Sequence, residues 1–324
     1  MRVGFGLGDV VTPEYLKYAV QFGATDIRVG RGAIPARNGR WELQDLVKLR
    51  QSVEQFGLTL TAIENVPTAF YDHIMLGGPN RDEQIENMIA TVRNMARAGI
   101  PIFGYNWMPS NVWRSPSQHI RAGAEATAFD YAVAEESPPT HDREYTEEEM
   151  WEYMEHWIRI ITPVAEEEGI RLGIHPCDPP VEKLGGIPQL LRSFAAYRRL
   201  TEIVDSPNNA IEFCQGTFSE MEDAADGGIY NMIRYFGERK KILYVHFRNV
   251  SNPVPKFHEE FINTGHVDMH KAMQIYYETG FDGFFMDDHV PHTHGDTEWG
   301  HRGRAFANGY IQAMIESVQK QAVK

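Results

Sequence analysis

The chain has 324 residues, of which 42% are hydrophobic and 23% charged, a composition that is ordinary for a globular protein and excludes a disordered or collagen-like chain. Its 45 Asp and Glu outnumber its 31 Lys and Arg, and the formal net charge of -14 argues against binding to nucleic acid or to an anionic membrane. An anionic small molecule must therefore be captured by a local group of Arg side chains, a metal ion or backbone N–H groups.

The sequence contains no run of about 18 apolar residues that would cross a bilayer, and its first residues lack the basic region and cleavage site of a signal peptide. We therefore expect a cytoplasmic protein. Cys177 and Cys214 are its only cysteines, and two cysteines in a chain of this length do not indicate a disulfide framework. Metal ligation or simple burial is the expected role of each.

Short apolar runs alternate with helical patterns along the whole chain. The first run, residues 2–6, precedes a helical pattern at 13–22, in which Thr12 is the expected N-cap and Pro13 takes the first helical position. Further strands are expected, in chain order, at 26–29, 58–64, 102–105, 171–175, 210–213, 242–247 and 283–286. Further helices are expected at 43–56, 81–98, 146–168, 187–203, 269–279 and 305–319.

The order of these elements favours a closed parallel (β/α)8 barrel over a doubly wound sheet, because no linker divides the repeats. The expected fold class is therefore α/β, with a single TIM-barrel domain over residues 1–324. Residues 107–145 are rich in Trp and Pro and are expected to form an inserted loop or helical region after the fourth strand. In a barrel, such an insertion overhangs the active-site face.

Polar side chains stand at the C-terminal ends of the predicted strands, where the active site of such a barrel lies. They are, in chain order, Glu64, Asn106, His175, Cys214, His246, Arg248, Asp287, Asp288 and His289. Because these strand ends converge on one pocket, residues that are far apart in the sequence become neighbours there.

Four of these residues form a plausible ligand set for one divalent transition metal, with two imidazoles, a thiolate and a carboxylate: His175, Cys214, His246 and Asp288. The thiolate favours Mn2+, Fe2+ or Zn2+ over Mg2+ or Ca2+. Each residue alone has a structural explanation, as a satisfied barrel-end histidine, a packed cysteine or an aspartate that caps a loop. Their coincidence on adjacent strand ends favours the metal.

Arg248 lies two residues after His246 and so shares the inward face of the seventh strand. We expect its forked guanidinium to bind the carboxylate of a substrate, with Asn106 and Glu64 as further substrate-binding residues. The alternative is an internal ion pair of Arg248 with Glu212 or Glu64 that only braces the barrel.

Asp288 and His289 are adjacent, so they cannot face the same way on a regular strand, and a turn is expected to begin there. One residue can then ligate the metal while the other acts as an acid or base, which makes the two the expected catalytic residues. His292, His294 and His301 lie nearby and are given no ligand role.

Together these motifs resemble the mannonate dehydratases of the hexuronate-degradation type, which belong to the xylose-isomerase-like barrels. The segments that match are Ile63-Glu64-Asn65-Val66-Pro67, Asn94-Met95-Ala96-Arg97-Ala98-Gly99-Ile100, Tyr105-Asn106-Trp107-Met108-Pro109, His175-Pro176-Cys177-Asp178-Pro179-Pro180, Phe213-Cys214-Gln215-Gly216-Thr217, Val245-His246-Phe247-Arg248-Asn249-Val250, Val267-Asp268-Met269 and Asp288-His289.

The resemblance implies a Mn2+- or Fe2+-dependent lyase that removes water from a sugar acid such as D-mannonate and yields a 2-keto-3-deoxy acid. It also implies that His289 transfers a proton and that the metal ligands are His175, Cys214, His246 and Asp288. The expected partner is then a small sugar acid, while the sequence leaves a homo-oligomer open.

Four departures from the family pattern fall on the expected lining of the substrate pocket. A His is missing from the segment Gly30-Arg31-Gly32-Ala33-Ile34-Pro35, and Val112-Trp113-Arg114-Ser115 replaces an Asp-Trp-Thr-Arg stretch. Ile262 stands where a His is expected, and His301 stands where a Tyr is expected. We therefore predict weak or absent activity on D-mannonate and dehydration of a related aldonic acid.

Two other functions compete with dehydration. A metal-dependent sugar isomerase or epimerase would use a similar pocket, and it would be distinguished by the absence of an α-keto acid product. A non-catalytic sensor of sugar acids would bind ligand through Arg248 and Asn106 but would not need His289.

Overall fold

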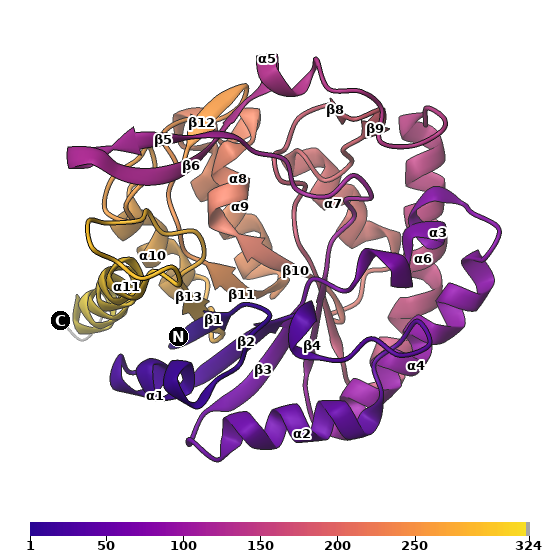
Figure 1. The fold of residues 1–324 in the computed structure, drawn as a ribbon, viewed down its shortest axis with the longest axis horizontal. Coiled ribbons are helices and arrows are strands. Elements are labelled where there is room, and N and C mark those ends of the chain that lie inside the picture. The colour runs from indigo at the N-terminus through magenta and orange to yellow at the C-terminus, as the bar shows by residue number, and fades with distance from the viewer. Residues whose placement is uncertain (322–324) are drawn as a thin grey trace.

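The computed structural model describes residues 1–321 and shows eight parallel strands closed into a barrel (Figure 1). Around the barrel the strands follow the order β1-β13-β11-β10-β7-β4-β3-β2. Their bounds are β1 Arg2–Leu7, β2 Asp26–Gly30, β3 Thr59–Glu64, β4 Ile102–Tyr105, β7 Arg171–Ile174, β10 Asn209–Cys214, β11 Ile242–His246 and β13 Phe284–Met286. The predicted barrel and all eight of its strands are confirmed.

The principal helices lie outside the strands and cover the barrel (Figure 1). They are α1 Pro13–Gln21, α2 Leu43–Glu54, α4 Arg81–Ala98, α6 Glu147–Glu168, α7 Phe194–Ile203, α9 Gly228–Glu238, α10 Met269–Glu278 and α11 His301–Gln321. Thr12 caps α1 as expected, since its side chain accepts a hydrogen bond from the Tyr15 N–H at 3.2 Å. None of the helices within residues 1–321 is both long and apolar enough to span a membrane.

The insertion after β4 differs from the loop or helical region that we expected. Strands β5 (Ser115–Ile120) and β6 (Ala124–Asp130) form an antiparallel hairpin, which β12 (Lys256–His258) extends to three strands. Only the short helix α5 (Tyr131–Ala134) follows. The inward positions of β6 are small alanines alternating with exposed residues, a period-two pattern whose apolar signal is too weak to stand out.

The helix expected at 187–203 begins later than predicted. Ile187–Pro188 is strand β9, paired with β8 (Lys183–Leu184), and α7 starts only at Phe194. Pro188 lacks an N–H group for a helix, while Ser193 provides a cap by accepting a hydrogen bond from the Ala196 N–H at 3.2 Å. Two helices that we did not predict, α8 (Gln215–Glu220) and α9, follow β10.

The barrel contains an apolar cluster and has buried polar side chains near both ends of its strands. The apolar cluster consists of seven buried residues, Ala62, Ile102, Ala210, Leu243, Tyr244, Phe284 and Met286. Above them, Gly104 in β4 makes room for polar groups, because a Cβ atom at this position would lie 2.8 Å from the Tyr244 hydroxyl and 2.9 Å from the Glu64 Cβ. Shorter helices, α3 (Asp72–Leu76) among them, complete the outer layer.

Candidate metal centre and active site

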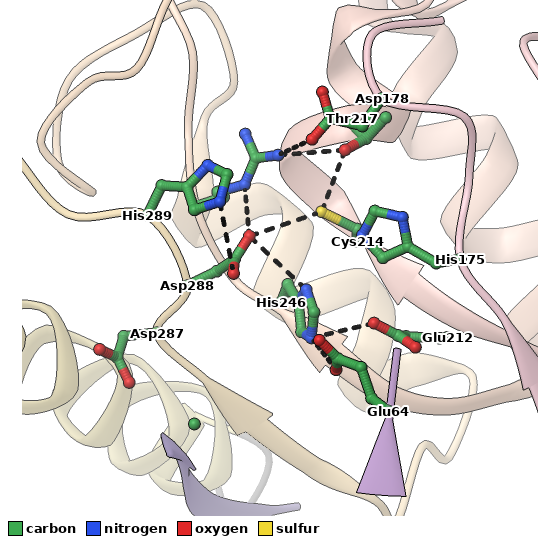
Figure 2. Close-up of polar contacts among 12 residues, drawn as sticks. Glu64, His175, Asp178, Glu212, Cys214, Thr217, His246, Asp287, Asp288 and His289 are labelled. Atoms are coloured by element: carbon green, nitrogen blue, oxygen red, sulfur yellow. Dashed lines mark hydrogen bonds and ion pairs between the residues drawn. The ribbon is translucent and has the colours of Figure 1, made fainter. Parts of the chain in front are cut away.

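Strand register brings the predicted metal ligands together. In the barrel, β7, β10, β11 and β13 are consecutive neighbours, and Cys214 at the end of β10 pairs with His246 at the end of β11. His175 directly follows β7, and Asp288 stands two residues beyond the end of β13. Figure 2 shows these four side chains pointing toward one another. The positions expected from the sequence therefore meet at one point.

Three of the four donor atoms have the spacing that a small cation requires, and Asp288 lies close to two of them. One atom each of His175, Cys214 and His246 lies within 4.8 Å of the others. The Asp288 Oδ2 atom lies 3.9 Å from the Cys214 Sγ and 3.6 Å from the His246 Nδ1. Ligands at metal bond lengths of about 2.0–2.3 Å are separated by roughly 3.5 Å, so modest shifts would close this set around an ion.

The imidazole rings are oriented so that each keeps one nitrogen for the centre. The His175 Nδ1 lies 2.7 Å from the Pro176 carbonyl oxygen, which leaves Nε2 free. The His246 Nε2 lies 3.1 Å from the Glu64 Oε2, and the buried His246 Nδ1 has no hydrogen-bond partner among residues 1–321. Because a buried polar atom without a partner is costly, this nitrogen fits a metal ligand.

Glu64, Glu212 and His246 form a second group of close potential ligands, one layer deeper in the barrel. The Arg28 guanidinium already neutralises the Glu64 carboxylate, since its Nε lies 2.8 Å from the Glu64 Oε2. The Tyr244 hydroxyl donates a hydrogen bond to the same oxygen at 3.1 Å. The group formed by His175, Cys214, His246 and Asp288 is therefore the better candidate.

The two deep glutamates have opposite protonation behaviour. Burial would raise the pKa of Glu64, but Arg28 and His246 outweigh it and lower that pKa to about 2. Burial and the neighbouring Glu64 charge raise the pKa of Glu212 to about 8. Glu64 is thus an ionised acceptor that holds the ring of His246, while Glu212 stays protonated at neutral pH.

Cys214 has the environment of a thiolate. Burial opposes its ionisation, but the positive charges of Arg248 and His175 lower its pKa well below the usual value. The Thr217 hydroxyl donates to its Sγ at 3.2 Å. By contrast, burial raises the pKa of Cys177 to about 12, and this thiol packs near the Trp107 carbonyl, so burial alone accounts for it.

Arg248 occupies a buried network of carboxylates. Its Nε donates to Asp288 Oδ2 at 2.8 Å, and its Nη1 lies 3.0 Å from Glu220 and 2.8 Å from Glu259. Its Nη2 donates to the Thr217 hydroxyl at 3.0 Å. These contacts favour the alternative of an internal brace, with Glu220, Glu259 and Asp288 as partners in place of Glu212 or Glu64. Direct substrate binding by Arg248 stays a prediction.

The expected turn after β13 separates its polar residues (Figure 2). Asp287 points away from the centre and forms a short ion pair with Arg304 of α11, whereas Asp288 faces the ligands. The His289 Nδ1 lies 2.9 Å from the Glu259 Oε1, and its Nε2 lies 3.9 Å from the Asp288 Oδ1. His289 is part-exposed and so can reach a ligand in the barrel mouth.

Asn106 lies in a different part of the mouth. Its side-chain amide donates to Asn65 at 3.1 Å and accepts from the Tyr71 hydroxyl at 3.2 Å. It helps to line a pocket of about 400 Å³ over the ends of β1 to β4, together with Asp9, Arg31, Asn65, Thr68, Met108, Asn111 and Val112. Glu64, by contrast, is buried beneath the centre and contacts His246, Tyr244 and Arg28.

The positions that depart from the family pattern are scattered. Gly32 packs against Asp9, and Val112 lines the pocket over β1 to β4. Ile262 is buried in the loop beside His289. His301 packs in an aromatic cluster with Tyr15, Tyr18 and Trp299, and its contacts do not include the ligand residues.

Several residues of the site were missed by the sequence reasoning. The Arg248 network includes Asp178, Glu220, Glu259 and, through Asp178, Arg114. Asp178 stands in the matched segment after His175, and Arg28 is a charged residue inside an apolar strand, so both carried a signal. Glu259 lies in a long connection after β11 and carried none.

Known proteins are similar to this chain over nearly its whole length. The family model for D-mannonate dehydratase (UxuA) matches residues 2–144 and 139–324. Mannonate dehydratase 2 of Halalkalibacterium halodurans is 31% identical, with 96% of this chain and 94% of that protein covered. The mannonate dehydratase of Streptococcus pneumoniae is 29% identical, with 99% and 94% covered.

Solved structures give the same relationship. The crystal structure of mannonate dehydratase from Streptococcus suis serotype 2 has a TM-score of 0.90 and 28% identity, and the match covers 100% of this chain and 96% of that one. A D-psicose 3-epimerase from Clostridium cellulolyticum H10 has a TM-score of 0.60 at 12% identity, with 99% of both chains covered. The likeness to the epimerase concerns the fold alone.

Proposed function

The chain belongs to the D-mannonate dehydratase family, and on that premise we propose that it dehydrates a hydroxylated acid at a metal centre over β7, β10, β11 and β13. Membership makes it a metal-dependent sugar-acid dehydratase, a hydro-lyase that breaks a carbon–oxygen bond. Its substrate, its metal and the roles of its residues are the parts that we propose.

We assign the metal ligands to His175, Cys214, His246 and Asp288. The observation that carries this assignment is the buried His246 Nδ1, which lacks a hydrogen-bond partner among residues 1–321 and faces Asp288 at 3.6 Å. A thiolate combined with imidazole and carboxylate donors suits a transition ion, and we propose Mn2+ or Fe2+. Such an ion, when bound, supplies Lewis acidity that stabilises negative charge developing beside it.

The reaction removes a proton from the carbon next to the carboxylate and a hydroxyl group from the following carbon. Water leaves, and the resulting enol becomes a 2-keto-3-deoxy acid. We assign the proton transfer to His289, because Glu259 holds its Nδ1 at 2.9 Å and directs Nε2 toward the centre. Asp288 takes part as the carboxylate between this ring and His246.

Arg248 is proposed to hold Asp288 in place. Its Nε donates to the same Asp288 Oδ2 atom that lies near Cys214 and His246, so the guanidinium fixes the orientation of the Asp288 carboxylate. Asn106 stands at the edge of the open pocket and is the better placed of the two remaining predicted substrate-binding residues. Glu64 acts through His246, whose ring it orients.

The test of the function is the product. The protein, supplied with Mn2+ or Fe2+ under anaerobic conditions, is incubated with a panel of aldonic acids, and α-keto acid is detected with semicarbazide. Formation of a 2-keto-3-deoxy acid supports dehydration. An isomerised or epimerised sugar without α-keto acid would support the competing function, and ligand binding that is unaffected by His289→Asn, with no turnover, would support a sensor.

We predict that D-mannonate itself is a poor substrate. Gly32 and Val112 stand in or beside the open pocket, where the family pattern has polar residues, so hydroxyl contacts to the substrate change. Steady-state assays with D-mannonate, D-gluconate and the pentonates measure the preference. A kcat/KM for D-mannonate above about 10⁴ M⁻¹s⁻¹, an ordinary value for a native substrate, would show that these positions do not set specificity.

A further inference from the structure

The pocket over β1 to β4 lies across the barrel mouth from the metal ligands, which follow β7, β10, β11 and β13. A chain of hydrogen bonds links the two regions. Tyr71 donates to Asn106, Asn106 donates to Asn65, and Asn65 donates to Glu64 at 3.1 Å. Glu64 in turn contacts His246. The pocket and the metal ligands therefore belong to the same barrel mouth and are joined by one hydrogen-bonded network.

The backbone around the pocket is specialised. Asn65 and Asn111, which both line it, have positive φ angles of 62° and 63°. Arg31 lies between two glycines that must lack a side chain, because a Cβ atom would lie 2.6 Å from the Asp9 Oδ1 at Gly30 and 2.5 Å from the Asp9 Cβ at Gly32. The Gly32 N–H donates to the Asp9 Oδ1 at 2.9 Å. The backbone of Arg31 is thus constrained at the pocket wall, and its side chain is exposed.

Arg31 differs from the other arginines of the barrel mouth. Arg28, Arg114, Arg248 and Arg304 are paired with Glu64, Asp178, Glu259 and Asp287, respectively. The Arg31 guanidinium has no ion pair or side-chain hydrogen bond with any of residues 1–321. It therefore remains available to a ligand.

The charge of Arg31 acts on the inside of the pocket. Burial raises the pKa of Tyr71, and Asn106 and the positive charge of Arg31 oppose that rise. Tyr71 is buried behind the pocket lining and donates a hydrogen bond to Asn106.

We propose that Arg31 binds a second anionic group of the substrate, at the end remote from the metal centre. The preferred substrate class is then a hydroxylated acid with anionic groups at both ends, and the remote group is a carboxylate or a phosphate. The amides of Asn65, Asn106 and Asn111 line the same pocket as Arg31 and suit hydroxyl groups. Because the protein carries a net charge of -14, a dianion needs such a local cation.

This proposal rests on the proposed dehydration, and the experiment separates the two. Metal-loaded wild-type protein is assayed with aldonates, aldarates and 6-phosphoaldonates of matched manno and gluco stereochemistry. Binding of each acid is measured in parallel by calorimetry. The variants are Arg31→Gln, which removes the charge, and Arg31→Lys, which keeps the charge without the fork. The matched control is Arg37→Gln, which removes the same charge from the same loop, where Arg37 pairs with Asp45 outside the pocket.

We expect the wild-type protein to favour a dianionic acid over its monoanionic counterpart by about tenfold or more in kcat/KM. Arg31→Gln should lower that ratio by about 10- to 100-fold, Arg31→Lys should lower it less, and Arg37→Gln should leave it unchanged. The aldarate and phosphate arms show which anion is preferred.

The proposal would be overturned if Arg31→Gln lowered kcat/KM equally for monoanionic and dianionic acids, which leaves their ratio unchanged. A wild-type preference for the monoanionic acid would also overturn it. If no acid yields an α-keto product, the dehydration itself fails. The calorimetric ratio of dianion to monoanion affinity, in wild type and in Arg31→Gln, then decides the role of Arg31 independently.

Discussion

The two ends of the barrel treat buried charge in opposite ways. At the N-terminal ends of the strands, Asp26 accepts hydrogen bonds from Arg2 at 2.8 and 3.0 Å, from Thr25 at 2.7 Å and from Thr61 at 2.7 Å, so both its oxygens are satisfied. At the C-terminal ends, the His246 Nδ1 and the Glu212 Oε2 are buried without a hydrogen-bond partner among residues 1–321.

This contrast indicates that the polar contacts at the N-terminal end stabilise the fold, while those at the C-terminal end bind ligands and catalyse the reaction. Polar groups that are all paired inside the chain need no ligand, and they fix one arrangement of the strands. Unpaired donors and acceptors in a buried cluster destabilise the fold unless something else satisfies them. We infer that the C-terminal end is completed by a metal ion and a substrate, whereas Asp26 at the N-terminal end needs no ligand.

The largest effect is expected for a variant at the C-terminal end that loses catalytic activity but still binds the metal. His289→Asn removes the proposed acid–base group but no metal ligand, so we expect kcat to fall by about 10²- to 10⁴-fold while the metal content is unchanged. Stopped-time assays of α-keto acid, together with elemental analysis, measure both. A variant that keeps at least half of the wild-type kcat would remove His289 from the mechanism.

The next effect tests how strongly the C-terminal network depends on Arg248. Arg248→Met leaves the carboxylates of Glu220, Glu259 and Asp288 without their shared cation, and we expect the free energy of unfolding to fall by roughly 3–5 kcal/mol. Arg2→Met is the matched control at the other end, where the Arg2 side chain is 46% exposed. Denaturant titration measures the free energy of unfolding of both variants. An equal loss in the two variants would contradict the proposed difference between the two ends of the barrel.

A smaller effect is expected from the N-terminal end. Asp26→Asn weakens its contacts with Arg2, Thr25 and Thr61, and we expect a loss of roughly 1–3 kcal/mol in unfolding free energy with kcat unchanged. Asp205→Asn, at an 88% exposed side chain that pairs with Lys241, serves as the control with a lesser effect. A drop in kcat for Asp26→Asn without a loss of stability would contradict the division between the ends.

The same residue has a predictable dependence on pH. Burial raises the pKa of Asp26, but hydrogen bonds from Arg2, Thr61 and Thr25 outweigh it and leave the pKa below its usual value. The stability from Asp26 is therefore fully present above its unfolded pKa of about 4 and is lost as the pH falls through the lower folded value. The wild-type protein should lose more stability than Asp26→Asn between pH 5 and pH 2 or so.

The sequence predicted the barrel well because strand positions depend on local patterns. All eight strands and the convergence of His175, Cys214, His246 and Asp288 follow from apolar runs and the geometry of parallel strands. The ligand roles themselves stay a prediction until metal is measured.

What the sequence could not provide were partners that meet only in three dimensions. Arg248 was placed on the correct face, yet its partners are Glu220 at the end of the short helix α8 and Glu259 just after β12, and neither segment has a periodic signal that predicts this packing. The hairpin of β5 and β6 was missed because its buried positions are alanines. The sequence alone does not show that Arg31 lacks an ion pair within residues 1–321, because Arg28, Arg114 and Arg304 find their carboxylate partners only in the folded barrel.

A metal ion is proposed to complete the C-terminal end of the barrel, and elemental analysis of the purified protein tests this most directly. We predict about one Mn or Fe per chain in wild-type protein prepared without chelator, and the same content in Cys177→Ala, which changes a buried cysteine outside the ligand set. Cys214→Ser and His175→Ala should weaken metal binding by roughly 100-fold or more while remaining folded by circular dichroism. Metal content and affinity equal to wild type in both of these variants would contradict the assignment.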